Sequence, residues 1–186
     1  MKTFFLFCSL FLITITNAQT NLVKNGGFES DLINWRGEEN ASISPYDKKT
    51  GKNSAMINQF VGNEWKALDQ TFSVPKKTFA LEVSVWIKSN AIETQKEEYK
   101  NGAVIVEFTN SADKQITSER IGQAVGSTNW TQFKKTIKIP AEAKNVRIML
   151  ALAQTNGTVF FDDVKAIALS EEEYLKQNPT TVTSEN

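Results

Sequence analysis

Hydrophobic and polar residues alternate along residues 79–88, as expected for a β-strand that buries one face. The hydrophobic positions are Phe79, Leu81, Val83, Val85 and Ile87, and the positions between them are Ala80, Glu82, Ser84, Trp86 and Lys88. The same period predicts core positions in two more segments: Val104, Val106 and Phe108, then Val146, Ile148, Leu150 and Leu152. The residues expected to point away from the core there are Ile105, Glu107, Arg147, Met149 and Ala151.

Short strand-like segments recur through the whole chain. After an opening strand at 21–29, they are expected at 41–46, 54–61, 67–74, 79–88, 103–109, 116–121, 131–139, 146–154 and 158–169. Turn-forming residues separate many of them: Gly51, Gly62, Pro75, Gly102, Gly126, Pro140 and Gly157. No convincing helical period precedes the last residues. The pattern predicts an all-β fold, an antiparallel β-sandwich or jelly roll.

The two ends of the chain have a different character. Residues 1–18 combine Lys2 with an apolar run and small residues before Gln19, which is typical of a secretory signal peptide and too short for a membrane-spanning helix. We therefore expect a secreted protein with one domain at 19–169. In the tail, 170–186, Ser170 and the glutamates after it form a capping-box pattern that predicts a short helix, which Asn178 and Pro179 would end.

Composition removes several kinds of chemistry. The sequence has no histidine, and its one cysteine, Cys8, lies in the predicted signal peptide. Ser-His-Asp or Cys-His catalysis, disulfides and an ordinary zinc site are therefore excluded for the mature chain. Lys and Arg number 21 against 21 Asp and Glu, interspersed rather than grouped, so we expect no nucleic-acid partner. Oxygen-ligated calcium, carboxylate chemistry and recognition by aromatic and amide groups remain.

Two adjacent aspartates interrupt the last predicted strand. An ionised carboxylate is costly to bury without a partner, so whichever of Asp162 and Asp163 points inward must meet a cation or strong donors. Phe160, Val164 and Ala166 share the parity of Asp162, which favours Asp162 as the inward residue. Phe161 and Ile167 favour Asp163 instead, but we take Asp162 as the inward residue.

The opening segment N-G-G-F-E, ending at Glu29, and the closing D-D-V around Asp162 resemble those of galactose-binding-like β-sandwich domains. In particular, they are similar to carbohydrate-binding modules of families four, nine, sixteen and twenty-two. The resemblance implies a structural calcium held by the Gly27 carbonyl, Glu29, a carbonyl from the loop around Lys52, and Asp162. Without a metal, backbone amides together with Lys24 or Lys52 would have to satisfy the buried carboxylate.

The same resemblance suggests where a sugar would bind. If the three alternating strands share a sheet, its outer face displays Glu82, Trp86, Glu107 and Arg147, a flat aromatic platform among polar groups. Similar modules carry an exposed aromatic at the position of Trp65, just before a strand with a glutamine like Gln70. Tyr99 lies in the long connection 89–101 and could close over a ligand. Trp65 and Trp86 could equally serve packing, whereas Trp35 and Trp130 are expected in the core.

These features favour a secreted, non-catalytic and monomeric carbohydrate-binding module. The family resemblance favours β-glucan or xylan-type chains as the ligand. A structural or adhesive surface protein with the same fold is an alternative. A small glycosidase or lyase with Glu82 and Glu107 as its carboxylate pair is a further one.

Overall fold

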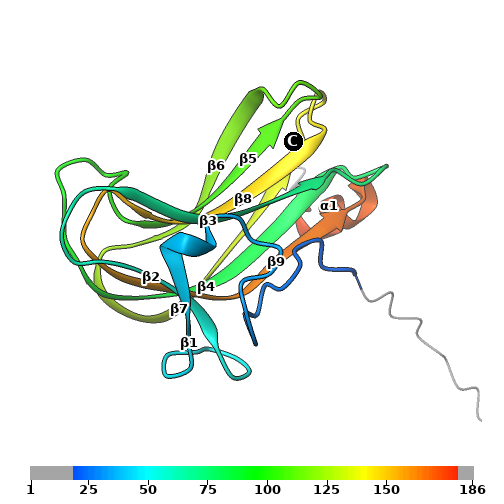
Figure 1. Cartoon of the computed structure of the whole chain (residues 1–186). Coiled ribbons are helices and arrows are strands. Elements are labelled where there is room, and N and C mark those ends of the chain that lie inside the picture. The colour runs from blue at the N-terminus through cyan, green and yellow to red at the C-terminus, as the bar shows by residue number, and fades with distance from the viewer. Residues whose placement is uncertain (1–18, 180–186) are drawn as a thin grey trace, which may run out of the picture.

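The computed structural model describes residues 19–179, so the predicted signal peptide and the last residues, 180–186, lie outside the described part (Figure 1). Within residues 19–179, nine strands follow one short 3-10 helix, η1 (Glu38–Asn40), and precede one helix, α1 (Glu171–Gln177). The strands are β1 (Ala41–Ser44), β2 (Ser54–Gln59), β3 (Trp65–Ser73), β4 (Ala80–Ile92), β5 (Gly102–Thr109), β6 (Gln115–Ala124), β7 (Gly126–Lys138), β8 (Asn145–Ala153) and β9 (Gly157–Leu169).

The strands form two antiparallel sheets. The five-stranded sheet has the order β1-β2-β9-β4-β7, and the four-stranded sheet has the order β3-β8-β5-β6. In Figure 1 the strands of the smaller sheet run side by side toward the top of the view, away from β4 and β9. The predicted all-β antiparallel sandwich is therefore confirmed. Within residues 19–179, no helix combines the length and hydropathy needed to cross a membrane.

The core lies between the inner faces of the sheets, as the alternation predicts. From β4, β5 and β8 it takes Leu81, Val83, Val85, Ile87, Val104, Val106, Phe108, Val146, Ile148, Leu150 and Leu152, all buried. Phe79, expected in the core, is only half-buried and precedes β4. Its ring packs against Tyr174 of α1, with ring centroids 5.2 Å apart. Because a sandwich has two outer faces, residues outside this core are divided between two separate surfaces.

A β-bulge in β9 changes which side each residue faces. Trp86 pairs with Asp162 and Ser84 with Lys165, so β9 has one residue more than β4 across this interval. The extra residue is Asp163, with φ +50°. Phe161 before the bulge and Val164 after it are both buried in the core. The parity argument that pointed Asp162 inward is therefore wrong: Asp162 shares the outer face of the larger sheet with Trp86.

The first segment of the described chain lies beside the last strand, as predicted. The Leu22 amide donates to the Ala166 carbonyl (2.8 Å), and the Val164 amide donates to the Gly26 carbonyl (2.9 Å). Asn21 forms an isolated bridge to Ile167 rather than a continuous strand. At the other end, the predicted capping box of α1 is present: the Ser170 hydroxyl accepts from the Glu173 amide, and the Glu173 carboxylate accepts from the Ser170 amide.

Candidate functional site

The two sheets separate residues that the sequence placed on one face. Glu82 and Trp86 lie on β4, in the five-stranded sheet, whereas Glu107 and Arg147 lie on β5 and β8, in the four-stranded sheet. The shared face predicted for these residues is therefore wrong. Glu82 instead forms an ion pair with Lys134 (2.8 Å) on its own sheet. The predicted catalytic pair of Glu82 and Glu107 is divided for the same reason.

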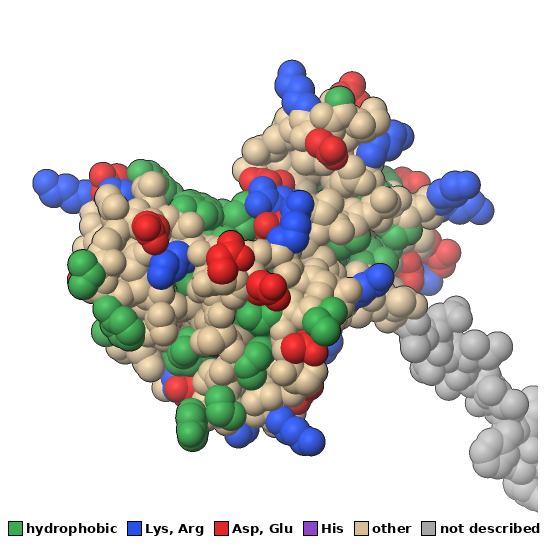
Figure 2. All heavy atoms as spheres, in the orientation of Figure 1, with side chains coloured by type: hydrophobic (Ala, Val, Ile, Leu, Met, Phe, Trp, Pro, Cys, Tyr) green, Lys and Arg blue, Asp and Glu red, His purple; other side chains and the backbone are tan. Residues whose placement is uncertain are grey.

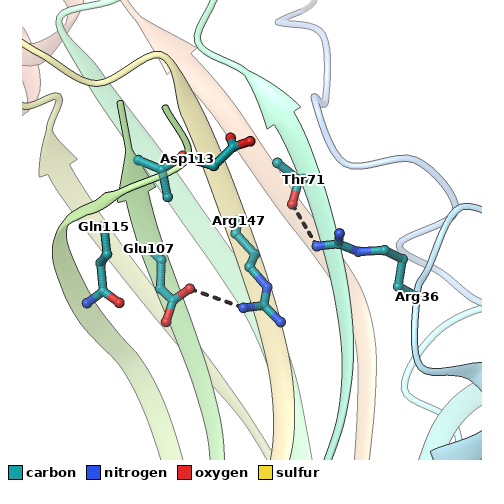
Figure 3. Close-up of a pocket in the computed structure, with 7 residues that line it drawn as sticks. Arg36, Thr71, Glu107, Asp113, Gln115 and Arg147 are labelled. Atoms are coloured by element: carbon teal, nitrogen blue, oxygen red, sulfur yellow. Dashed lines mark hydrogen bonds and ion pairs between the residues drawn. The ribbon is translucent and has the colours of Figure 1, made fainter. Parts of the chain in front are cut away.

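A polar cavity lies on the outer face of the four-stranded sheet (Figure 3). Its volume is about 530 Å³, and it is lined by Arg36, Thr71, Glu107, Thr109, Asp113, Gln115 and Arg147. Register brings its centre together, since Arg147 on β8 lies opposite Thr71 on β3 and Glu107 on β5. Figure 2 shows the surface hollowed between two raised parts, with basic and acidic side chains gathered beside the hollow.

An ion-pair network forms the floor of this cavity. Arg147 Nη2 lies 3.0 Å from Asp69 Oδ2, and Arg147 Nη1 lies 3.4 Å from Glu107 Oε2. Arg36 binds the other oxygen of Asp69 and also donates to Thr71 Oγ1 (3.1 Å). The Nε of Arg147 is buried and has no hydrogen-bond partner among residues 19–179. The network therefore holds the guanidinium groups in place while leaving donor capacity in a cavity wall.

The network also fixes the charge state of Asp69. Burial favours its neutral form, but the hydrogen bonds and charges of Arg147 and Arg36 outweigh burial and hold the pKa of this carboxyl below its ordinary value. The hydrogen bond to Asp69 raises the pKa of Arg147, against the opposing effect of its burial. Asp69 and Arg147 are therefore charged at neutral pH. Counted by formal charge, two arginines (Arg36, Arg147) and three carboxylates (Asp69, Glu107, Asp113) sum to −1, so the cavity is polar without being positive.

Sequence reasoning missed most of the residues that line this cavity. Thr71 and Thr109 could have been found, because they share the strand parity of Asp69 and Glu107. Asp113 lies in the β5–β6 turn and Gln115 directly after it, where no periodic pattern exists. Arg36 joins the site through an isolated bridge with Asp69, between segments far apart in the chain.

The predicted aromatic platforms lie in separate places. Trp65 is 42 % exposed at the start of β3, on the same face as Thr71, and six residues of extended strand separate the two by about 20 Å. Trp86 lies on the other sheet, and the ammonium group of Lys49 sits 4.0 Å from its ring centroid. Tyr99 is 48 % exposed in the β4–β5 connection. Trp65 therefore extends the face that carries the cavity, whereas Trp86 does not.

The remaining residues proposed from sequence have mainly structural contacts. Gln70 is buried, and its amide accepts from the Lys24 amide (2.8 Å) and donates to the Lys24 carbonyl (2.9 Å), so it ties the opening segment to β3. Trp35 is buried against Phe28, as predicted. Trp130, also expected in the core, is instead half-buried and packs near Phe160, with ring centroids 6.5 Å apart.

Asp162 and Glu29 meet the same loop, between β1 and β2. Asp162 Oδ2 accepts from the backbone amides of Lys49 (2.8 Å) and Thr50 (2.9 Å), and Asp162 Oδ1 accepts from the Asp163 amide (2.7 Å). Glu29 Oε2 accepts from the Lys52 amide (2.7 Å). Burial raises the pKa of Asp162, and the amide hydrogen bonds only partly oppose this effect. We call Glu29, Asp162 and residues 47–53 the terminal clasp.

Glycine at position 51 lets the Glu29 carboxylate lie close to the backbone of the terminal clasp. Gly51 has φ +57°, and a Cβ atom there would lie 1.7 Å from Glu29 Oε1. The clasp holds carboxylates and backbone carbonyls, which are the oxygen ligands that calcium prefers. Among residues 19–179, no cluster of three or more His, Cys, Asp or Glu side chains is placed to hold a metal. A cation here would therefore depend on two carboxylates and backbone carbonyls.

Residues 20–157 match the family described as carbohydrate binding domain. The chain belongs to this family. No curated protein matches the sequence. A carbohydrate-binding role is accordingly supported by the family, and the β-sandwich agrees with the fold of solved carbohydrate-binding modules.

Solved structures share the fold at low sequence identity. A family 61 carbohydrate-binding module in complex with β-1,4-galactotriose is 16 % identical, with a TM-score of 0.57, covering 81 % of this chain and 99 % of that one. A family 22 module from Clostridium thermocellum is 15 % identical, with a TM-score of 0.54 and coverage of 82 % and 97 %. The enzymatically active domain of tailspike protein 4 from bacteriophage CBA120 is 15 % identical, with a TM-score of 0.60. The match covers 80 % of this chain but only 21 % of the tailspike chain.

Proposed function

We propose that the protein is a secreted, non-catalytic and monomeric module that binds a neutral polysaccharide across the outer face of its four-stranded sheet. The observation that carries the proposal is the cavity around Arg147, where guanidinium, carboxylate, amide and hydroxyl groups from four strands and two loops converge. Sugar hydroxyl groups donate and accept hydrogen bonds, so they match this mixture of groups. Solved relatives in complex with galactotriose and xylohexaose support a glycan as the ligand.

The net negative charge of the cavity favours neutral glycans over acidic ones. Asp69 already binds both arginines, and Glu107 binds Arg147. A uronic acid would have to compete with these carboxylates and would meet a net negative site. Neutral chains of the xylan, β-glucan or galactan type avoid this repulsion. Trp65, about 20 Å along β3 from Thr71, offers a flat apolar surface to a later unit of the same chain.

Affinity electrophoresis tests this proposal. The mature protein is run in gels containing xylan, mixed-linkage β-glucan, galactan or polygalacturonate, beside Gln115→Ala and the control Lys114→Ala. Both residues are exposed neighbours, but only Gln115 lines the cavity. We expect retardation by a neutral polysaccharide, weakened in Gln115→Ala and unchanged in Lys114→Ala. Retardation only by polygalacturonate, or by none of the four, would overturn the proposal. Release of reducing ends would favour an enzyme instead.

We also propose that calcium strengthens the terminal clasp, held by the carboxylates of Glu29 and Asp162 and by the backbone carbonyls of Gly27 and Lys52. The support is the convergence of both chain ends on one loop. Melting temperature is measured with added calcium and with a chelator, for the parent and for Glu29→Gln. A rise with calcium that Glu29→Gln abolishes is expected. Equal melting of the parent in both buffers would mean that backbone amides alone hold Asp162.

A further inference from the structure

A second cavity lies at the opposite end of the strands from the β1–β2 loop. Its volume is about 340 Å³, and it is formed by the ends of β2 and β4 and the start of β9. The β2–β3, β4–β5 and β8–β9 connections gather at this end, on the left of Figure 1. The Glu93 amide donates to the Asn156 carbonyl (3.0 Å), which joins two of these connections. The cavity shares no lining residue with the one around Arg147.

Two side-chain oxygens of residues that line this cavity have no hydrogen-bond donor in the described part of the chain. Gln59 is only 3 % exposed; its Nε2 donates to the Thr155 carbonyl (3.1 Å), but its Oε1 has no partner among residues 19–179. Asn156 Nδ2 donates to Glu93 Oε2 (3.2 Å), and Asn156 Oδ1 is likewise buried and unpaired within the described chain. A buried acceptor without a donor costs about 1–3 kcal/mol. Two of them in one cavity indicate a site for a ligand rich in O–H groups.

An aromatic ring stands beside these acceptors. Phe60 follows Gln59 directly, lines the same cavity and is 77 % exposed. A large exposed aromatic next to buried, unpaired polar groups is a typical arrangement for holding a sugar ring, since the ring packs on the apolar face of the sugar while its hydroxyls reach the acceptors. The Glu93 carboxylate adds acceptors and disfavours an anionic ligand.

We propose that this cavity is a second saccharide-binding site, which takes a single pyranose unit of a neutral glycan. Phe60 stacks on the sugar ring, and the side-chain oxygens of Gln59 and Asn156 accept hydrogen bonds from its hydroxyls. The inference rests on the proposed function for its class of ligand but on separate residues for its site. With two sites on one module, binding at either raises the local concentration of the same polysaccharide at the other.

Nuclear magnetic resonance of the ¹⁵N-labelled mature protein tests the inference. Xylohexaose, cellohexaose and β-1,4-galactotriose are titrated into the parent, Phe60→Ala, Val61→Ala and Gln115→Ala. Val61 is the matched control because it is 90 % exposed beside Phe60 but does not line the cavity. We expect saturable shifts of the Asn156 side-chain amide and the Gly157 amide with one of these sugars. In Phe60→Ala the dissociation constant for these shifts should rise about three- to tenfold, and in Val61→Ala and Gln115→Ala it should stay unchanged.

The outcomes separate the two sites. Shifts confined to the amides around Thr71 and Gln115 would overturn the second site and leave the proposed function standing. Equal affinities of Phe60→Ala and Val61→Ala at Gly157 would also overturn it. Shifts at Gly157 with none around Thr71 would support the second site while contradicting the proposed function. No shift at either place, in a protein whose spectrum shows it folded, would contradict both.

Discussion

Each outer face of the sandwich carries a buried aspartate, and the two are stabilised in opposite ways. Asp69, on the four-stranded sheet, binds the side chains of Arg36 and Arg147, whose charges hold its pKa below the ordinary value despite burial. Asp162, on the five-stranded sheet, binds backbone amides of Lys49 and Thr50, and burial raises its pKa. One site consists of side-chain charges beside a cavity, whereas the other is closed by the main chain.

This difference suggests that the surroundings of Asp69 serve ligand binding, whereas those of Asp162 serve the stability of the fold. Side-chain ions such as Arg147 can exchange partners with a ligand at little cost to the backbone, so the surface around Asp69 is suited to recognition. Releasing Asp162 would instead free the loop at 47–53 and leave its amides without acceptors. We therefore expect substitutions at Asp162 to act mainly on stability, and those around Asp69 to act on both stability and ligand binding.

Replacing Asp162 should have the largest effect on stability. Asp162→Asn replaces one carboxylate oxygen by an NH₂ group, so in either orientation of the new amide a donor would face a backbone amide donor of Lys49, Thr50 or Asp163. We expect a loss of about 2–3 kcal/mol in the free energy of unfolding, measured by urea denaturation. Asp163→Asn is the matched control, since Asn tolerates its positive φ and only an ion pair with Lys165 is lost, worth about 0–1 kcal/mol. Equal losses in the two variants would contradict the structural role of Asp162.

Replacing Asp69 should have an intermediate effect on the free energy of unfolding. Asp69→Asn leaves Arg147 and Arg36 without their shared carboxylate. Since both guanidinium groups are partly exposed, solvent reduces the penalty to about 1–2 kcal/mol. Glu119→Gln is the control on the same sheet, because it breaks only the exposed pair with Lys135. A loss in Asp69→Asn no larger than in Glu119→Gln would show that the arginines do not depend on Asp69.

The free energy of unfolding should also depend on pH differently in the parent and in Asp69→Asn. The folded-state pKa of Asp69 lies below its unfolded value, so its ionised form stabilises the fold fully above the unfolded pKa. This contribution is lost as pH falls from the unfolded pKa through the lower folded pKa. Urea denaturation of the parent between pH 5 and pH 2, about the range in which carboxyl groups titrate, should therefore show a steeper decline than that of Asp69→Asn. Parallel declines would contradict the role assigned to the arginines.

The sequence predicted the sandwich because alternation is a local property. The core positions of β4, β5 and β8 could be read from the chain, and the pairing of the chain ends was implied by the family resemblance of the N-G-G-F-E and D-D-V segments. The face on which Asp162 lies could not be predicted from the sequence, because the bulge at Asp163 shifts the alternation by one residue. Such a shift depends on pairing with β4.

The candidate site was harder to predict than the fold. Alternation identified Glu107 and Arg147 as outward-facing, but it carries no information about which of the two sheets a strand joins. Glu82 and Trp86 were therefore placed with them, although they face the opposite side of the molecule. Arg36, Asp113 and Gln115 come from loops and strand ends, where position depends on tertiary contacts rather than on any repeating pattern.

The smallest expected effect is a change in affinity for the polysaccharide without a change in stability. It is tested by replacing one tryptophan on each outer face. Trp65 lies on the cavity-bearing face, whereas Trp86 lies on the opposite face beneath the ammonium group of Lys49. With the neutral polysaccharide that retards the parent most, Trp65→Ala should weaken binding about three- to tenfold, the loss expected from one aromatic contact of about 0.5–1.5 kcal/mol. Trp86→Ala should bind as the parent does. Weaker binding in Trp86→Ala alone would move the glycan to the five-stranded sheet, where the half-buried Trp130 would then be the neighbouring aromatic residue.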